Sequence, residues 1–311
     1  VLDRMRVTSF ERDGDRVVGV RAAGGAGQEH MFRASLVVGA DGRHSTVARQ
    51  VEAEEYLAYD APRAMFWGYW NAPAIWREPD YPFGMYVANT DGHIRVIFHT
   101  DHDQLLIGSL PPVEQALAWR ADPEAALTGD LASDATTGPL VAGAAPDGPV
   151  RGTVKERYFF RRGAGNGWTL LGDAGHHKEF VIGDGITEAL LQARDLAAAI
   201  AQGTDAALMR WWRARDVEAL PFFFLGQDEG ALGPPSELQQ VVFARAAKAP
   251  ALRARLAATM EHRLSPTETF PVRHVLWWAL GAAFRGTPRV LSQFITKGKR
   301  GSAIEHELRL R

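Results

Sequence analysis

Residues 168–200, WTLLGDAGHHKEFVIGDGITEALLQARDLAAAI, constrain the fold of this chain more than any other stretch. Residues 168–171 are a short apolar run typical of a buried strand, and the run ends at Gly172-Asp173. A polar loop follows, and from Gly185 onward the apolar residues recur at helical spacing. A strand that ends in Gly-Asp before a glycine-rich start of a helix is typical of the ligand-binding edge of α/β proteins. The free N–H groups and the positive dipole end of such a helix suit an anion or an electron-rich ring.

A second stretch of the same kind lies near the start of the chain. The apolar run 34–38 is typical of a strand in a parallel sheet, and it ends at Gly39-Ala40-Asp41-Gly42-Arg43, just before a helical pattern at 46–50. Glycine lets the backbone approach a phosphate closely, and Arg43 supplies a cation beside it. An Asp-Gly pair after a strand is by itself more often a turn than a site, so only the presence of both motifs in one chain indicates a ligand site.

Taken in this order, the two motifs resemble the DG and GD motifs of FAD-dependent monooxygenases of the aromatic-hydroxylase type (group A). The resemblance is nearest to the subfamily whose loop reads roughly GDAG-aromatic/His-HK-acid-P, followed by QGI-T/S. It implies that Asp173 hydrogen-bonds the ribityl chain of FAD and that the backbone of residues 183–187 lies against the pyrimidine end of the flavin. It also implies that Asp41 and its neighbours touch both FAD and the pyrophosphate of the nicotinamide nucleotide. The cofactor-binding residues expected from the resemblance are Gly39, Asp41, Gly42, Arg43, Gly172, Asp173, His176, Gly183, Asp184, Gly185, Ile186 and Thr187.

The chain departs from this pattern at Phe180, Asp184 and Gln192, which replace the loop proline, the glutamine before the glycine and an acid of the helix. Asp184 matters most, because a carboxylate beside the flavin N1–O2 edge opposes the negative charge of reduced flavin. Residues 176–178 (His-His-Lys) offer compensating positive charge, or they merely solvate the loop. The sequence leaves both alternatives open.

Composition excludes several classes of function. A net charge of −2 gives no electrostatic footprint for nucleic acid. The absence of cysteine excludes disulfides, thiolate metal sites and a cysteine nucleophile, and it fits a cytoplasmic protein. The sequence contains no run typical of a signal peptide or a membrane span. His99 and His102 stand beside two aspartates, but their spacing favours a solvated loop, and we predict no metal site.

The fold class expected is α/β (α+β): a partial FAD/NAD(P)-binding Rossmann-type domain with an inserted antiparallel β-sheet domain and a helical C-terminal region. The predicted segments are 1–51 (DG motif), 52–162 (substrate-binding insert), 163–203 (GD motif) and 204–311 (helical). A flavoprotein of this kind carries G-x-G-x-x-G in a βαβ unit of about 30 residues, and the sequence lacks that run. We therefore expect an N-terminally truncated copy.

Strand patterns fill the insert. They are expected at 63–70, 84–88, 93–100, 104–109 and 150–161, with a small helix at 123–131. Trp67, Tyr69, Met85 and Phe98 are the side chains expected to line a flat apolar pocket, although packing within the core is the better explanation of any single one of these positions.

Helical patterns follow residue 204. A helix at 205–219 is expected to break at Pro221, and further helices are expected at 236–248, 251–263 and 273–284. By resemblance Phe222 faces the substrate cavity, and the alternative is a plain hydrophobic plug. The basic run at 297–300 is expected to be a frayed, solvated tail.

The resemblance implies a monooxygenase that uses FAD, NAD(P)H and O₂ to oxygenate a small apolar or aromatic substrate. Flavin supplies the chemistry, so no catalytic side chain is assigned. One alternative is a flavin-dependent reductase of isoprenoid-type double bonds, and another is a degenerate relative that binds a ligand without catalysis. A halogenase is disfavoured because the sequence has no Trp-x-Trp-x-Ile-Pro run. The substrate, the choice between NADH and NADPH, and the oligomeric state stay open.

Overall fold

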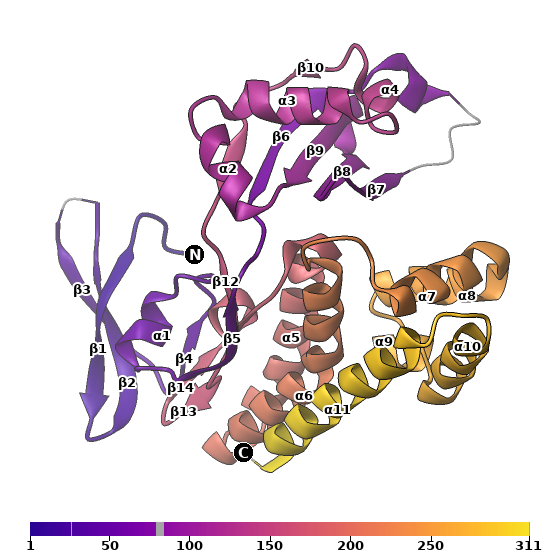
Figure 1. Ribbon diagram of the computed structural model, residues 1–311. Helices are drawn as coiled ribbons and strands as arrows, with labels where there is room; N and C mark the ends of the chain where they lie inside the picture. Colours follow the sequence, from indigo (N-terminus) through magenta and orange to yellow (C-terminus); the bar gives the residue numbers. More distant parts are fainter. Residues whose placement is uncertain (26, 79–83, 311) are drawn as a thin grey trace. The chain divides into compact units, whose positions relative to one another are not determined.

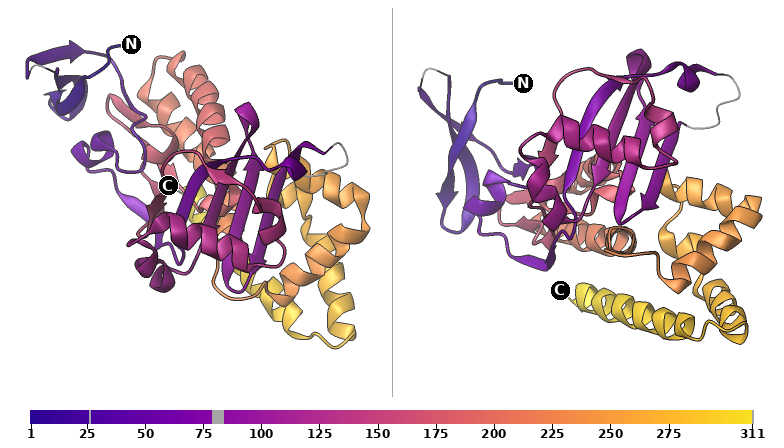
Figure 2. Two further views of the ribbon diagram at one scale, coloured as in Figure 1. Left: turned by 90° about the horizontal axis from the view of Figure 1, so that it is seen from above. Right: turned by 45° about the horizontal axis from the view of Figure 1, so that its top comes forward.

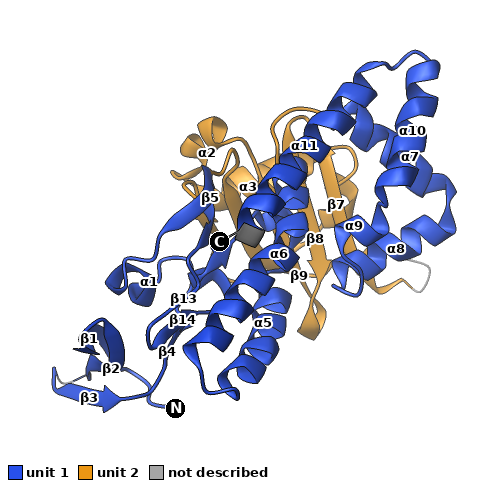
Figure 3. Cartoon of the chain, turned by 90° about the horizontal axis from the view of Figure 1, so that it is seen from below, with its two compact units in different colours: residues 1–59, 158–228, 235–311 blue, residues 60–157, 229–234 orange. Residues whose placement is uncertain are grey.

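A computed structural model describes residues 1–25, 27–78 and 84–310 of the chain. These residues form an α/β fold that divides into two compact units (Figure 3). Unit 1 consists of residues 1–59, 158–228 and 235–311, and unit 2 of residues 60–157 and 229–234. The helical C-terminal region therefore lies mostly in the same unit as the two motifs.

The strands follow one another along the chain as β1 (Arg6–Asp13), β2 (Arg16–Ala23), β3 (Glu29–Arg33), β4 (Val37–Gly39), β5 (Glu55–Asp60), β6 (Met65–Asn71), β7 (Met85–Thr90), β8 (His93–His99), β9 (Gln104–Leu110), β10 (Ala145–Pro146), β11 (Arg151–Thr153), β12 (Arg157–Arg161), β13 (Ala164–Gly165), β14 (Trp168–Leu170) and β15 (His176–His177). The α-helices are α1 (Thr46–Gln50), α2 (Val113–Trp119), α3 (Pro123–Ser133), α4 (Gly138–Val141), α5 (Gly185–Ile200), α6 (Asp205–Glu229), α7 (Glu237–Lys248), α8 (Pro250–Met260), α9 (Pro266–Thr269), α10 (Val272–Phe284) and α11 (Arg289–Leu310).

A small sheet in unit 1 joins the two motifs (Figure 1). Its strands run in the order β13-β14-β4, and β14 pairs with β4 in parallel, with Leu170 opposite Gly39. The strand expected at 34–38 is thus shorter and begins later, at Val37. Its buried contacts come from α1 and β2 as well as β14, because Val17 and Val47 pack in one cluster with Leu170.

The first three strands form an antiparallel sheet in the order β1-β2-β3. The hairpin β1–β2 turns at Gly14, whose φ of 56° is a conformation that glycine adopts without strain. The sheet meets the motif sheet through backbone bonds, since the N–H of Val17 donates to the carbonyl of Asn166 at 3.0 Å.

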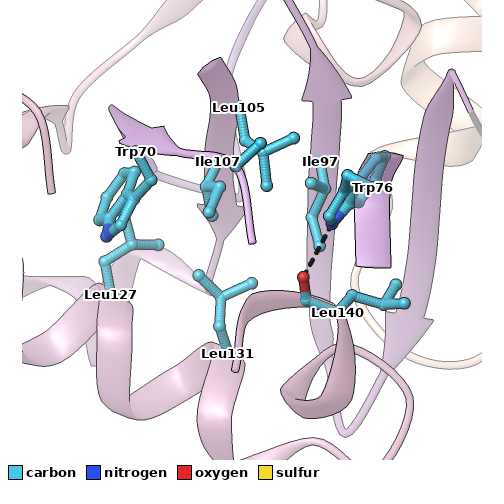
Figure 4. Packing of buried hydrophobic residues seen from close by; sticks show 9 residues of the cluster. Trp70, Trp76, Ile97, Leu105, Ile107, Leu127, Leu131 and Leu140 are labelled. Atoms are coloured by element: carbon cyan, nitrogen blue, oxygen red, sulfur yellow. Dashed lines mark hydrogen bonds between the residues drawn. The ribbon is translucent and has the colours of Figure 1, made fainter. Parts of the chain in front are cut away.

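Unit 2 is built on an antiparallel sheet whose strands run β10-β6-β9-β8-β7, with β11 also paired to β6. Helix α3 lies across one face of this sheet (Figure 2). Trp70, Ile97 and Ile107 from the strands pack there against Leu127 and Leu131 of α3 (Figure 4). The expected helix at 123–131 and four of the five expected strands are therefore confirmed.

The strand expected at 150–161 is wrong as a single element. It divides into β11, which pairs with β6 in unit 2, and β12, which pairs with β15 in unit 1. Between them Glu156 is buried and accepts a hydrogen bond from the Thr153 hydroxyl at 2.6 Å. This local side-chain bond competes with continued strand pairing and turns the chain.

The predicted helix break at Pro221 is also wrong, because α6 continues through it to Glu229. A proline inside a helix costs about 3 kcal/mol or more. Leu220, Phe222 and Phe223 are buried around it, and their burial offsets that cost.

The C-terminal run is helical rather than frayed. α11 includes residues 297–300, and both Lys297 and Arg300 form ion pairs with Asp228 of α6, at 2.8 and 3.2 Å. α7, α8 and α10 confirm the helices expected before it. Across the described residues, no helix combines the length and the apolar character that crossing a bilayer requires.

Candidate functional site

The parallel pairing of β4 and β14 brings both motifs to the same edge of the sheet. Asp41 follows β4 and Asp173 follows β14, and the N–H of Leu171 donates to the carbonyl of Gly39 at 2.8 Å. The short helix α1 begins after the first motif and α5 after the second (Figure 1). Carboxyl ends of neighbouring parallel strands are where open α/β sheets bind ligands.

In the first motif, Asp41 supports the start of α1. Its Oδ2 accepts hydrogen bonds from the N–H groups of Thr46 at 2.7 Å and Val47 at 3.2 Å. Gly39 is confined, because a Cβ there would lie 2.7 Å from the Cβ of Val47 and 2.9 Å from Leu170 Cδ2. The motif thus combines close packing below the loop with a carboxylate oriented at its surface.

Arg161, at the end of β12, connects the two motif loops. Its Nη1 donates to the carbonyl of Arg43 at 3.1 Å and to that of Ala174 at 3.2 Å. The same guanidinium pairs with Glu55 at 2.8 Å and lies 3.9 Å from the centre of the Phe159 ring. One planar cation with several donors is therefore hydrogen-bonded to both motif loops.

A cavity of about 400 Å³ opens beside the first motif. Its lining is Arg43, His44, Ser45, Ala48, Arg49, Glu52, Ala53, Glu55 and Arg161. Arginine guanidinium groups in such a place suit a phosphate or carboxylate.

In the second motif, the backbone is fixed and the carboxylate is accessible. The N–H of Gly172 donates to Gln192 Oε1 at 3.1 Å, so the departure at this helix position has a structural role. The Asp173 side chain is 40% exposed, and its Oδ2 lies 3.3 Å from His177 Nδ1. The imidazole orients the carboxylate, which keeps acceptor capacity for a ligand hydroxyl.

The start of α5 exposes both backbone and apolar surface. Gly183 precedes the helix with a φ of 71°, and a Cβ there would meet open space for 4 Å. Gly185 and Thr187 are exposed, and the Ile186 side chain is 81% exposed. An apolar, donor-bearing surface of this kind suits the face and the polar edge of a flat ring.

Asp184 points away from that surface. It is buried, and its Oδ2 accepts from Lys178 Nζ at 2.7 Å and lies 2.9 Å from His262 Nε2. Lys178 also pairs with Glu188 of α5. The second alternative for residues 176–178, that they merely solvate the loop, is wrong for Lys178, because its ammonium is buried between two carboxylates.

Two pKa values in this cluster are lowered, for different reasons. Burial raises the pKa of Glu188, but the neighbouring His176 imidazole and the charge of Lys178 outweigh it and hold that pKa at about 2. Burial lowers the pKa of His176, whose Nδ1 lies 3.4 Å from Glu188. His176 is enclosed by Phe160 and Phe223 rather than aimed at solvent.

The same cluster has the composition of a metal site. One ligand atom each of Asp184, Glu188 and His262 lies within 4.8 Å of the others. Lys178 already supplies a positive charge to both carboxylates. The expectation of no metal stays a prediction.

The predicted substrate residues of unit 2 lie on one face of its sheet. The pairing places Tyr69 opposite Leu106, Leu106 opposite Phe98, and Phe98 opposite Met85, in one row across four strands. Trp67 lies two residues along β6 on the same face. This face is opposite the one that α3 covers, and Tyr69 and Met85 are each 43% exposed.

Phe222 lies in unit 1, where it is buried and stacked on His262 with ring centres 4.3 Å apart. With Pro221, Glu188 and Arg215 it lines a cavity of about 520 Å³. That Phe222 faces a substrate cavity stays a prediction.

Comparison with known proteins identifies the family. The family model described as "FAD binding domain" matches residues 1–207. The chain belongs to this FAD-binding family. A search of curated proteins found no match.

Solved structures share the fold of this FAD-binding chain. The flavin-dependent brominase Bmp2 has a TM-score of 0.70 at 18% identity, covering 82% of this chain and 64% of its own. A flavoprotein/dehydrogenase from Cytophaga hutchinsonii has a TM-score of 0.71 at 11% identity, covering 89% and 69%. PqsL of P. aeruginosa in complex with 2-aminobenzoylacetate has a TM-score of 0.54 at 23% identity, covering 73% and 62%. The chain spans 54 to 64% of the length of the brominase and halogenase structures.

The residues present fit a flavin. Asp173 offers a half-exposed acceptor for a hydroxyl chain, and the start of α5 offers backbone donors next to the exposed Ile186. The buried Asp184 carboxylate is paired with the Lys178 ammonium, so a positive charge accompanies its negative charge near this surface. Each predicted flavin contact of these residues stays a prediction.

Sequence reasoning missed Arg161 and His262. Arg161 stands in an expected strand, where an arginine ordinarily indicates only a solvated edge. His262 is 78 residues from Asp184 in the sequence, and no motif surrounds it. Neither position carries a local pattern that could have indicated its role.

Proposed function

We propose that this chain is part of a flavin-dependent monooxygenase that oxygenates a small apolar or aromatic substrate with FAD, NAD(P)H and O₂. The observation that carries the proposal is the parallel pairing of β4 and β14, which puts Asp41 and Asp173 at one edge of one sheet. The family match supports the cofactor, since both motifs lie within residues 1–207.

The chain's residues have distinct roles in this proposal. Asp173 accepts a hydrogen bond from a hydroxyl of the ribityl chain, and His177 holds the carboxylate in place at 3.3 Å. The N–H groups at the start of α5 donate to the pyrimidine end of the ring. FAD, when bound, supplies the redox chemistry: NAD(P)H gives two electrons, one oxygen atom of O₂ enters the substrate, and the other leaves as water.

The open face of the unit 2 sheet is the proposed substrate surface. Trp67, Tyr69, Phe98 and Met85 present flat or flexible apolar groups on this face. Arg151 of β11 lies opposite Trp67 and adds a cation at one end of the surface. PqsL, a neighbour in fold, was solved with the aromatic compound 2-aminobenzoylacetate. We propose a substrate of the same broad class, apolar or aromatic and small.

The first test measures FAD binding by the protein purified in its natural form, and the absorption spectrum of the flavin reports the binding. We expect the wild type to show the spectrum of bound flavin. In Asp173→Ala we expect the Kd for FAD to rise about tenfold, which corresponds to the loss of one good hydrogen bond. Asp195→Ala is the matched control, because Asp195 is a half-exposed aspartate of α5, like Asp173 in exposure, and it pairs with the neighbouring Arg194. Equal weakening by both variants would refute the role of Asp173, and absence of binding would refute the proposal.

The second test separates the enzyme classes that share this fold. Oxygen consumption coupled to a hydroxylated product supports the monooxygenase. NAD(P)H oxidation coupled to loss of a substrate double bond, without oxygen in the product, would support the reductase of isoprenoid-type double bonds. A product that requires added halide would support halogenation, and flavin binding without turnover would support the degenerate relative.

A further inference from the structure

Asp184 occupies the N-cap position of α5 but does not cap the helix. An N-cap aspartate ordinarily accepts hydrogen bonds from the second or third N–H of its helix, here those of Ile186 and Thr187. Among the residues that the structure describes, its side chain accepts no such bond. Its Oδ1 is buried without a hydrogen-bond partner in the same described residues.

Two side chains hold the Asp184 carboxylate in this unusual place. Lys178 Nζ donates to Oδ2 at 2.7 Å, and His262 Nε2 lies 2.9 Å from the same oxygen. Lys178 is fixed in turn by Glu188, one turn into α5. His262 is fixed by stacking on Phe222 at 4.3 Å with 19° between the ring planes.

A buried carboxylate must be paired or hydrogen-bonded. If Lys178 or His262 did not hold Asp184, the donors at the start of its own helix would be the ones that an aspartate in this position ordinarily uses. Capping would occupy the N–H groups of Ile186 and Thr187 and would add a negative charge at the end of the helix dipole. Both effects oppose binding of an electron-rich ring at that surface.

We infer that Lys178 and His262 are positioning residues that hold Asp184 away from the start of α5 and so keep the N–H groups of Ile186 and Thr187 available to the flavin. The inference rests on the proposed function and adds a role for the region beyond the family match, since His262 lies outside residues 1–207. It also gives a reason for an aspartate at this position: the carboxylate binds Lys178 and His262 inside the protein and does not face the ligand.

The decisive variant is His262→Phe, which keeps an aromatic ring against Phe222 and removes the hydrogen bond to Asp184. We expect amide hydrogen exchange of Ile186 and Thr187 to slow by about tenfold as Asp184 caps the helix, the value of one added hydrogen bond. His262→Phe/Asp184→Ala should restore fast exchange, and His262→Gln, whose amide can still donate, should resemble the wild type.

The matched control is His274→Phe, because His274 is an exposed histidine of α10 that also stacks on an aromatic ring, that of Trp278. It should leave both amides unchanged. Unchanged exchange in His262→Phe, or equal slowing in the double variant that lacks the Asp184 carboxylate, would overturn the inference. The hydrogen-exchange measurements on these variants do not require bound flavin.

The flavin readout tests the consequence. In His262→Phe we expect the Kd for FAD to rise about tenfold and the midpoint potential of bound flavin to fall, because a carboxylate then faces the ring; the double variant should recover the potential. If the wild type binds no FAD, the proposed function fails, while the exchange data still decide whether His262 positions Asp184. If FAD binds and the potential does not move in His262→Phe, the positioning role toward flavin is wrong although the function stands.

Discussion

Replacing Arg161 tests whether one side chain holds both motif loops together. Arg161→Met keeps the apolar stem and removes the guanidinium, which is 13% exposed. The two hydrogen bonds to the carbonyls of Arg43 and Ala174 are worth about 1 kcal/mol each. The partly buried pair with Glu55 adds about 0.5 kcal/mol, and the contact with the Phe159 ring adds about 0.5 kcal/mol. We therefore expect a loss of about 3 kcal/mol in the free energy of unfolding.

The assay is urea unfolding followed by tryptophan fluorescence, with the slope checked against the wild type. Arg157→Met is the matched control, because Arg157 begins the same strand and its ion pair with Asp60 is exposed on both sides. It should cost less than about 1 kcal/mol. If Arg161→Met costs no more than the control, Arg161 does not join the loops. A loss of stability together with unchanged FAD affinity would show that loop spacing does not govern cofactor binding.

Three further predictions concern packing, pH and the open sheet face. Gly39→Ala should destabilise the protein by about 1–3 kcal/mol, because the added Cβ would lie under 3.0 Å from two side chains. Gly298→Ala, in an exposed part of α11, should stabilise the protein by about 0.5–1 kcal/mol, and thermal unfolding measures both changes. The hydrogen bond with Asp130 raises the pKa of His93 above its usual 6.5. The stability that His93 contributes is therefore full below pH 6.5 and is lost as pH rises through the raised pKa. A His93→Gln variant whose stability keeps the same pH dependence would contradict this. Tyr69→Ser should change stability by less than about 1 kcal/mol, since Tyr69 is half exposed, but should raise KM for the substrate; a large stability loss would mean that Tyr69 belongs to the core.

The sequence predicted those elements whose own residues decide their structure. α5 is a helix of 16 residues in which apolar residues recur at helical spacing after a glycine-rich start, and its predicted beginning at Gly185 is confirmed. The strands of unit 2 alternate clearly enough that three of the predicted substrate residues fall in one row of the sheet. Alternation alone could not say which face was open, because that depends on where α3 packs.

Elements decided by tertiary contacts were predicted poorly. Pro221 favours a break in any isolated helix, and only the burial of its neighbours in unit 1 lets α6 continue. The basic run in α11 looks solvated until Asp228 is placed beside it. β4 has three residues, too few for a periodic pattern, and its boundaries follow from pairing with β14.

Asp184 illustrates why a local departure from a motif is hard to interpret in sequence. Beside a flavin, an extra carboxylate appears as a defect, since it opposes the charge of the reduced ring. In the structure the same carboxylate is paired with Lys178 from the motif loop and lies 2.9 Å from Nε2 of His262, which is 78 residues further along the chain. One partner of the Asp184 carboxylate therefore lies beyond the FAD-binding match. Substitutions at Asp184 and at His262 should accordingly be read together, because each one's effect on the flavin passes through the other.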